Sequence, residues 1–116
     1  ADKNGNITKT LQRNIIYIGD MIVCGDKEGP LSPSYKKVGG MLFADNAVEF
    51  DLFLTKLMGF NYLKIPTLRK AIEDSMLYNS NESVYFKSNI LKYSGELDDS
   101  IEDFRFIPTS GWKDYL

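Results

Sequence analysis

The chain has 116 residues, a formal net charge of −2, and a composition that is 43% hydrophobic and 26% charged. These values are ordinary for a globular protein, and single hydrophobic cores typically hold about 100–150 residues. Seven Phe, seven Tyr and one Trp supply enough apolar surface for a core without disulfides. We therefore expect a flexible N-terminal segment over residues 1–12 and a single globular domain over residues 13–116.

The sequence contains no histidine, and Cys24 is the only cysteine. Ser-His-Asp and Cys-His catalytic arrangements and His-containing zinc sites are therefore excluded within one chain. A lone cysteine cannot form an intramolecular disulfide, which fits a reducing compartment. No apolar run approaches the roughly 18 residues of a membrane span, and no signal-peptide pattern opens the chain. We expect no metal, no cofactor and no membrane span, and a cytoplasmic location.

The first third of the chain predicts β structure. Residues 14–26 are rich in Ile, Val and Tyr, which favours strand, with Gly19-Asp20 as a bulge or a tight turn between two short strands. Residues 25–34 are dense in Gly, Pro and Ser and predict a loop. Residues 35–44 then predict a further strand.

Residues 46–58 predict an amphipathic helix. Asn46 and Glu49 have the spacing of a capping box, and Gly59 is placed to end the helix in a left-handed turn. Large apolar side chains recur between them at helical spacing: Val48, Phe50, Leu52, Phe53, Leu54, Leu57 and Met58. We interpret this helix mainly as core, with an alternative in which part of its apolar arc stays exposed for a partner. A second helix is predicted over residues 67–78.

The last third of the chain returns to strand composition. Residues 82–95 predict a hairpin that turns near Ser88-Asn89, and residues 99–108 predict one more strand. Strands, two helices and further strands, in that order, are typical of an α+β fold. We expect a mainly antiparallel sheet with two helices packed on one face.

The acidic stretch ELDDSIEDF, residues 96–104, could hold a divalent cation, but it lacks the spacing and the turn glycine of a calcium-binding loop. Acidic runs are more often solvated faces or interaction patches. We interpret this segment as an acidic flank that steers a basic partner. The candidate residues are Asp98, Asp99, Glu102 and Asp103.

These features favour a small non-catalytic protein-binding domain, with a regulatory or assembly role, that acts through an aromatic-rich surface with acidic flanks. Aromatic residues are enriched at the centres of protein interfaces. The candidate anchors are Phe60, Tyr62, Trp112 and Tyr115. A protein partner, including a second copy of the chain, is favoured over nucleic acid, since the acidic excess weakens the case for a basic face.

Two alternatives come from other functional classes. The first is an enzyme that uses carboxylate, Tyr or Lys groups without imidazole. The second is a nucleic-acid-binding protein that uses residues 56–70, where four cations surround Phe60 and Tyr62. The abundance of Asn, Lys, Ile and Tyr is typical of AT-rich coding sequences, as in phages and some bacteria.

Overall fold

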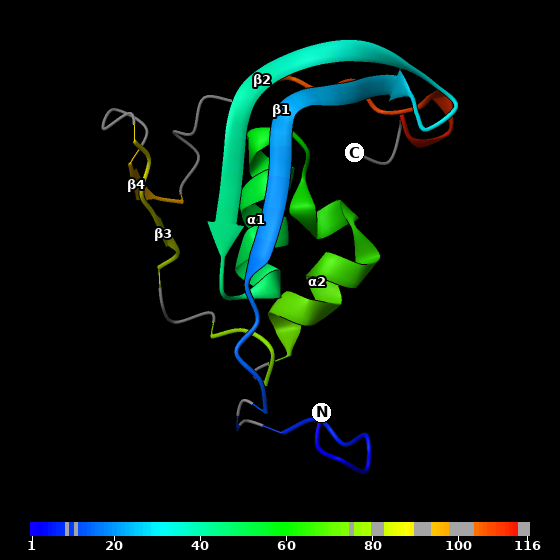
Figure 1. The fold of residues 1–116 in the computed structure, drawn as a ribbon. Coiled ribbons are helices and arrows are strands. Elements are labelled where there is room, and N and C mark those ends of the chain that lie inside the picture. The colour runs from blue at the N-terminus through cyan, green and yellow to red at the C-terminus, as the bar shows by residue number, and fades with distance from the viewer. Residues whose placement is uncertain are drawn as a thin grey trace.

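The computed structural model describes residues 1–8, 10, 12–74, 76–79, 83–89, 94–97 and 104–113. Its described part contains two antiparallel two-stranded sheets and two α-helices, which confirms the α+β class. The first sheet pairs β1 (Tyr17–Glu28) with β2 (Ser32–Ala44), and the second pairs β3 (Tyr85–Phe86) with β4 (Gly95–Glu96). The helices α1 (Ala47–Leu57) and α2 (Pro66–Glu73) follow β2 (Figure 1).

Strands β1 and β2 form one long bent hairpin. Figure 1 shows its lower half beside α1, while its upper half turns across the segment that leads to the C-terminus. The pairing register shifts between Met21 and Val23, where Gly39 of β2 has a left-handed φ of 81°. Such an extra residue bends a strand, and glycine adopts this conformation without steric cost. The sequence predicted a bulge or turn at Gly19-Asp20, but both residues lie in regular pairing and the irregularity follows them.

The loop predicted over residues 25–34 is mostly strand, so this prediction was wrong. Only Gly29, Pro30 and Leu31 lie between β1 and β2. Pro33 sits inside β2, opposite Lys27. Proline is tolerated in an edge strand, and both strands of a two-stranded sheet are edges. The local abundance of Pro, Gly and Ser therefore marked a tight hairpin end, not a long loop.

Helix α1 begins and ends where the sequence predicted. The Asn46 side chain accepts hydrogen bonds from the backbone N–H groups of Val48 (2.9 Å) and Glu49 (3.3 Å). At the other end Gly59 has a φ of 82°, and the N–H of Phe60 bonds to the carbonyl of Thr55 at 3.0 Å. These bonds satisfy backbone groups that a helix leaves unpaired at its two ends.

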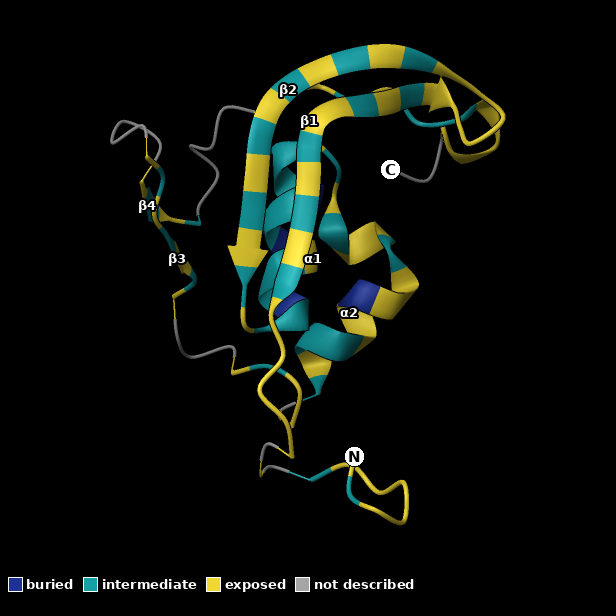
Figure 2. Cartoon of the chain, in the orientation of Figure 1, coloured by how far each residue is buried: buried dark blue, intermediate teal, exposed yellow. Residues whose placement is uncertain are grey.

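The small core is centred on α1. Val48, Leu52 and Thr55 form its buried row, and Leu68 of α2 is also buried (Figure 2). The remaining large apolar side chains of α1 are half-buried. The helix therefore serves as core, and the exposed apolar surface lies elsewhere.

Aromatic contacts join α1 to both sheets. The rings of Tyr17 in β1 and Phe50 lie 6.1 Å apart, and those of Phe53 and Phe86 in β3 lie 5.1 Å apart. Gly19 lets β1 approach α1 closely, because a Cβ there would lie 3.0 Å from the Phe50 ring. The hairpin therefore packs on α1 with the Phe50 ring against the backbone of Gly19, where β1 has no side chain.

Helix α2 ends at Glu73, several residues before the predicted end. Asp74 has extended backbone angles, and its carboxylate accepts a hydrogen bond from the N–H of Met76 at 2.8 Å. Aspartate side chains compete in this way with helical hydrogen bonds. The helical spacing of the apolar residues did not reveal this stop.

The strand predicted over residues 99–108 is not present in its described part, residues 104–108. The N–H of Phe104 bonds instead to the carbonyl of Leu57 at 2.8 Å, and that of Phe106 to the carbonyl of Met58 at 2.9 Å. The alternating Phe residues therefore pair with the C-terminal end of α1. The hairpin predicted over residues 82–95 is confirmed by the pairing of β3 with β4, although part of its connection lies outside the described residues.

A polar cluster centred on Asp26 ties the C-terminal segment to the hairpin. The Asp26 carboxylate accepts the N–H of Ile107 at 2.6 Å and lies 3.6 Å from the Lys36 ammonium of β2. Lys36 donates to the carbonyl of Arg105 at 2.9 Å, and its ammonium lies 4.9 Å from the centre of the Phe106 ring. Because the Asp26 side chain is only 9% exposed, these contacts are partly shielded from water. We call this cluster the Asp26 clamp.

Loss of the cap at Asn46 should destabilise α1. Asn46→Ala removes the acceptor for two backbone N–H groups and should lower the free energy of unfolding by about 1 kcal/mol. Urea unfolding followed by circular dichroism measures this change. Asn46→Asp keeps an acceptor and should retain most of the stability; equal losses in the two variants would contradict the capping role.

Substitution of Asp26 should loosen the C-terminal segment. Asp26→Ala leaves the Ile107 N–H and the Lys36 ammonium without this partner, and should cost about 2 kcal/mol. Asp26→Asn keeps a neutral acceptor and should cost less. Urea unfolding ranks the variants by their loss of stability. Asp51→Ala, at an exposed position on α1, is the matched control. Equal midpoints for Asp26→Ala and Asp51→Ala would refute the clamp.

Candidate protein-binding surfaces

The side of the β1–β2 hairpin that faces away from α1 carries a strip of exposed apolar side chains. Residues alternate along both strands between half-buried and exposed, apart from the irregularity near Val23 (Figure 2). Ile18 and Phe43 are direct cross-strand partners, and each is 60% exposed. We define the outer face as this strip together with its neighbours: Ile18, Ile22, Val23, Met41 and Phe43.

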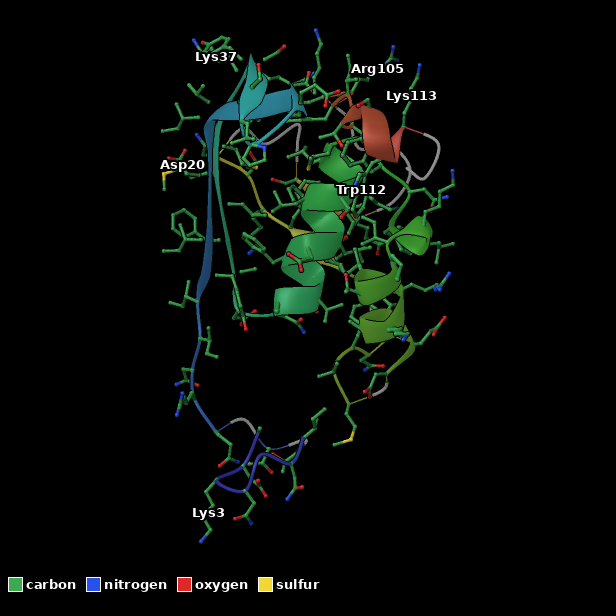
Figure 3. All side chains as sticks on the ribbon, turned by 90° about the vertical axis from the view of Figure 1, so that its right-hand side faces the viewer. Lys3, Asp20, Lys37, Arg105, Trp112 and Lys113 are labelled. Atoms are coloured by element: carbon green, nitrogen blue, oxygen red, sulfur yellow. The ribbon has the colours of Figure 1, made fainter. Side chains whose placement is uncertain are left out.

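Charged residues interrupt and border the outer face. Asp20 is paired with Met41, and Lys37 with Val23. Figure 3 shows the Asp20 and Lys37 side chains on the sides of the hairpin away from α1. An apolar centre with a polar border is the usual anatomy of a protein interface.

The opposite side of the hairpin, which meets α1, combines large and small residues in cross-strand pairs. Tyr17 pairs with Ala44, Leu42 with Gly19 and Met21 with Gly40, and all six residues are half-buried. In an antiparallel sheet with one solvated face, the large apolar residues normally face the core and polar residues face water. Here large apolar residues lie on both sides of the lower half, so the exposed side departs from that pattern.

A second candidate surface is an apolar groove at the hairpin end. Its volume is about 490 Å³. Phe60, Phe106, Ile107 and Trp112 line it together with prolines of the hairpin and of the C-terminal segment. Trp112 belongs to a short 3₁₀ turn (Ser110–Trp112) and is 53% exposed. We call this cavity the Trp112 groove.

The charged groups of the Trp112 groove have different environments. Asp26 is held in the clamp, and Glu28 accepts the N–H of Ser110 at 2.9 Å. Lys27 lines the groove and is exposed, and Lys113, which follows Trp112, is also exposed. The acidic groups therefore hold the C-terminal segment, while the two lysines face solvent.

Tyr62 lies in a different depression from Phe60. It lines a smaller, more polar hollow of about 280 Å³ with Lys56 and Tyr78. The Lys56 ammonium lies 6.0 Å from the Tyr62 ring centre. Burial, followed by the charge of Glu49 and by Tyr62, raises the pKa of the Tyr78 phenol above its ordinary value. The structure thus brings Phe60 together with Trp112 but not with Tyr62.

The cations of residues 56–70 are spread over separate places. Lys56 is half-buried beside Tyr62, whereas Lys64, Arg69 and Lys70 are exposed. The Arg69 guanidinium lies 3.5 Å from the carbonyl of Leu63. Phe60 in the Trp112 groove and Tyr62 in the polar hollow do not form one stacking platform with them.

Cys24 is half-buried on β1. Desolvation by the surrounding protein, followed by the charge of Asp20, raises the pKa of its thiol above the ordinary value. A thiol with a raised pKa is mostly protonated near neutral pH and is a weak nucleophile. Cys24 therefore has the environment of a structural residue of β1.

The other predicted site residues, Tyr115 and the acidic residues Asp98, Asp99, Glu102 and Asp103, lie outside the described residues. The prediction missed the outer face, including Ile18 and Phe43. The sequence did contain a signal for this face. Between residues 15 and 23, apolar residues occupy both odd- and even-numbered positions, as in strands that are covered on both faces.

Within the described ranges, no group of three or more Cys, Asp or Glu side chains is arranged to hold a metal ion. None of the helices described has the length and apolar character that crossing a bilayer requires. Comparisons of the chain with protein-family models, with curated proteins and with solved structures found no match. The two surfaces defined above are therefore the basis for a functional proposal.

Proposed function

We propose that this protein is a non-catalytic binding module whose outer face is covered by another protein. The observation that carries the proposal is the cross-strand row of large apolar side chains around Ile18 and Phe43, exposed to water on a two-stranded sheet. Large exposed apolar patches on soluble domains mark interaction sites. The partner can be a second copy of the chain or a different protein.

The energetics of the small core support this role. Only Val48, Leu52 and Leu68 are buried apolar residues among those described, although the chain is 43% hydrophobic. Burial of an apolar side chain contributes roughly 1.5–3 kcal/mol. A partner seated on the outer face would bury several such side chains at once, and assembly would supply stabilisation that the isolated chain lacks.

The backbone of the hairpin also suits assembly. An isolated two-stranded hairpin is marginally stable, and further strands with an apolar face or packing against a helix are needed for independent stability. The lower half of β1–β2 has α1 on one side only. A partner on the other side would complete a three-layer arrangement with the sheet in the middle.

A paired substitution tests the outer face. Ile18→Ser with Phe43→Ser removes two large exposed side chains, so the free energy of unfolding of the isolated chain should change by less than about 1 kcal/mol. Association should be abolished at the same time. Sedimentation velocity over a range of concentrations measures self-association. Affinity purification at high stringency, with quantification of stoichiometry, measures binding to a different protein.

Lys64→Ser with Lys70→Ser changes two exposed positions away from the hairpin and provides the matched control. The proposal predicts that the control associates like the wild type. A wild-type chain that is strictly monomeric and recovers the same proteins as the outer-face variant would disprove it.

A further inference from the structure

We infer that the Trp112 groove is a second, separate binding site, which takes an acidic segment of a protein and seats one of its apolar side chains between Phe60 and Trp112. The outer face is centred on the lower half of the hairpin, whereas the groove lies at the hairpin end with the C-terminal segment. The inference therefore does not depend on what covers the outer face.

The lining of the groove fits an apolar side chain. Its volume of about 490 Å³ exceeds that of any single side chain and falls within the usual range of ligand sites. Pro30, Pro33 and Pro108 lie in its wall with the aromatic rings. Proline and aromatic side chains have few rotatable bonds, so little conformational entropy is lost when a ligand contacts them.

The polar groups at the groove favour a peptide over a small molecule. Sites for small molecules usually aim several polar groups at the ligand. Here the Asp26 carboxylate accepts the Ile107 N–H, and the Glu28 carboxylate accepts the N–H of Ser110. These acceptors are already used to hold the wall of the groove, so a ligand is recognised by apolar contact and by charge at the rim.

Charge complementarity selects an acidic ligand. Lys27 is exposed and lines the groove, and Lys113 is exposed next to Trp112. Figure 3 places Arg105, Trp112 and Lys113 at the same end of the molecule. Among the described residues at this end, the cations Lys27, Lys36, Arg105 and Lys113 outnumber the carboxylates of Asp26 and Glu28, which makes the rim attractive to carboxylates of a partner.

The backbone at Lys27 adds support. Lys27 has a left-handed φ of 64°, and its N–H bonds to the carbonyl of Ile107 at 2.9 Å. This conformation is unfavourable for a residue other than glycine, because the Cβ crowds the backbone. A lysine at a position where glycine would avoid that cost is consistent with a use for its side chain at the rim.

Intrinsic fluorescence can test the inference directly, because Trp112 is the only tryptophan. The probes are a capped peptide in which Phe and Leu alternate with Glu, and a matched peptide in which Lys replaces each Glu. The acidic peptide should shift the Trp112 emission to shorter wavelength in a saturable manner, since it excludes water from the indole. The basic peptide should bind at least about tenfold more weakly, as expected for two exposed charge pairs.

Charge-reversal variants provide the second arm. Lys27→Glu with Lys113→Glu should reverse the preference between the two peptides, whereas Lys3→Glu with Lys70→Glu, which alters exposed lysines elsewhere, should preserve it. The outer-face variant with Ile18→Ser and Phe43→Ser should bind the acidic peptide like the wild type. Absence of saturable binding, equal binding of both peptides, or no effect of the rim reversal would each overturn the inference.

Discussion

The Asp26 carboxylate joins both strands of the β1–β2 hairpin to the C-terminal segment, which is distant in sequence. It lies on β1, beside the Lys36 ammonium of β2, and accepts the backbone N–H of Ile107. Lys36 in turn reaches the carbonyl of Arg105. A charge with little exposure to water is stable only when it is paired and hydrogen-bonded. Together with the bonds of Phe104 and Phe106 to the end of α1 and of Ser110 to Glu28, this contact positions the C-terminal segment and with it Trp112.

The hairpin packs on α1 through its inner side and carries the proposed binding surface on its outer side. Its inner side has glycine where α1 approaches, as at Gly19 beside Phe50, and its outer side carries Ile18 and Phe43. Such a strand resembles one that is covered on both faces, yet the described residues cover only one. The partner that we propose would cover the second face and so account for the difference between sequence pattern and exposure.

Local signals in the sequence predicted local structure well. Asn46 and Gly59 predicted the two ends of α1, because capping depends on residues within one turn of each helix end. Predictions failed where distant contacts decide the structure. Phe104 and Phe106 alternate as in a strand, but their N–H groups donate hydrogen bonds to carbonyls at the end of α1. Pro33 suggested a loop, and only the edge position of β2 makes a strand possible.

The candidate site was predictable in part. Phe60 and Trp112 were both expected to be anchors, but no periodicity could indicate that they share a groove, since the Asp26 clamp brings them together. This dependence has a thermodynamic consequence for the proposed ligand. The groove exists only while the C-terminal segment is docked on the hairpin, so a ligand that binds the groove also stabilises the docked state, by an amount that grows with ligand concentration. Binding at Trp112 and docking of the C-terminal segment are therefore coupled, and each strengthens the other.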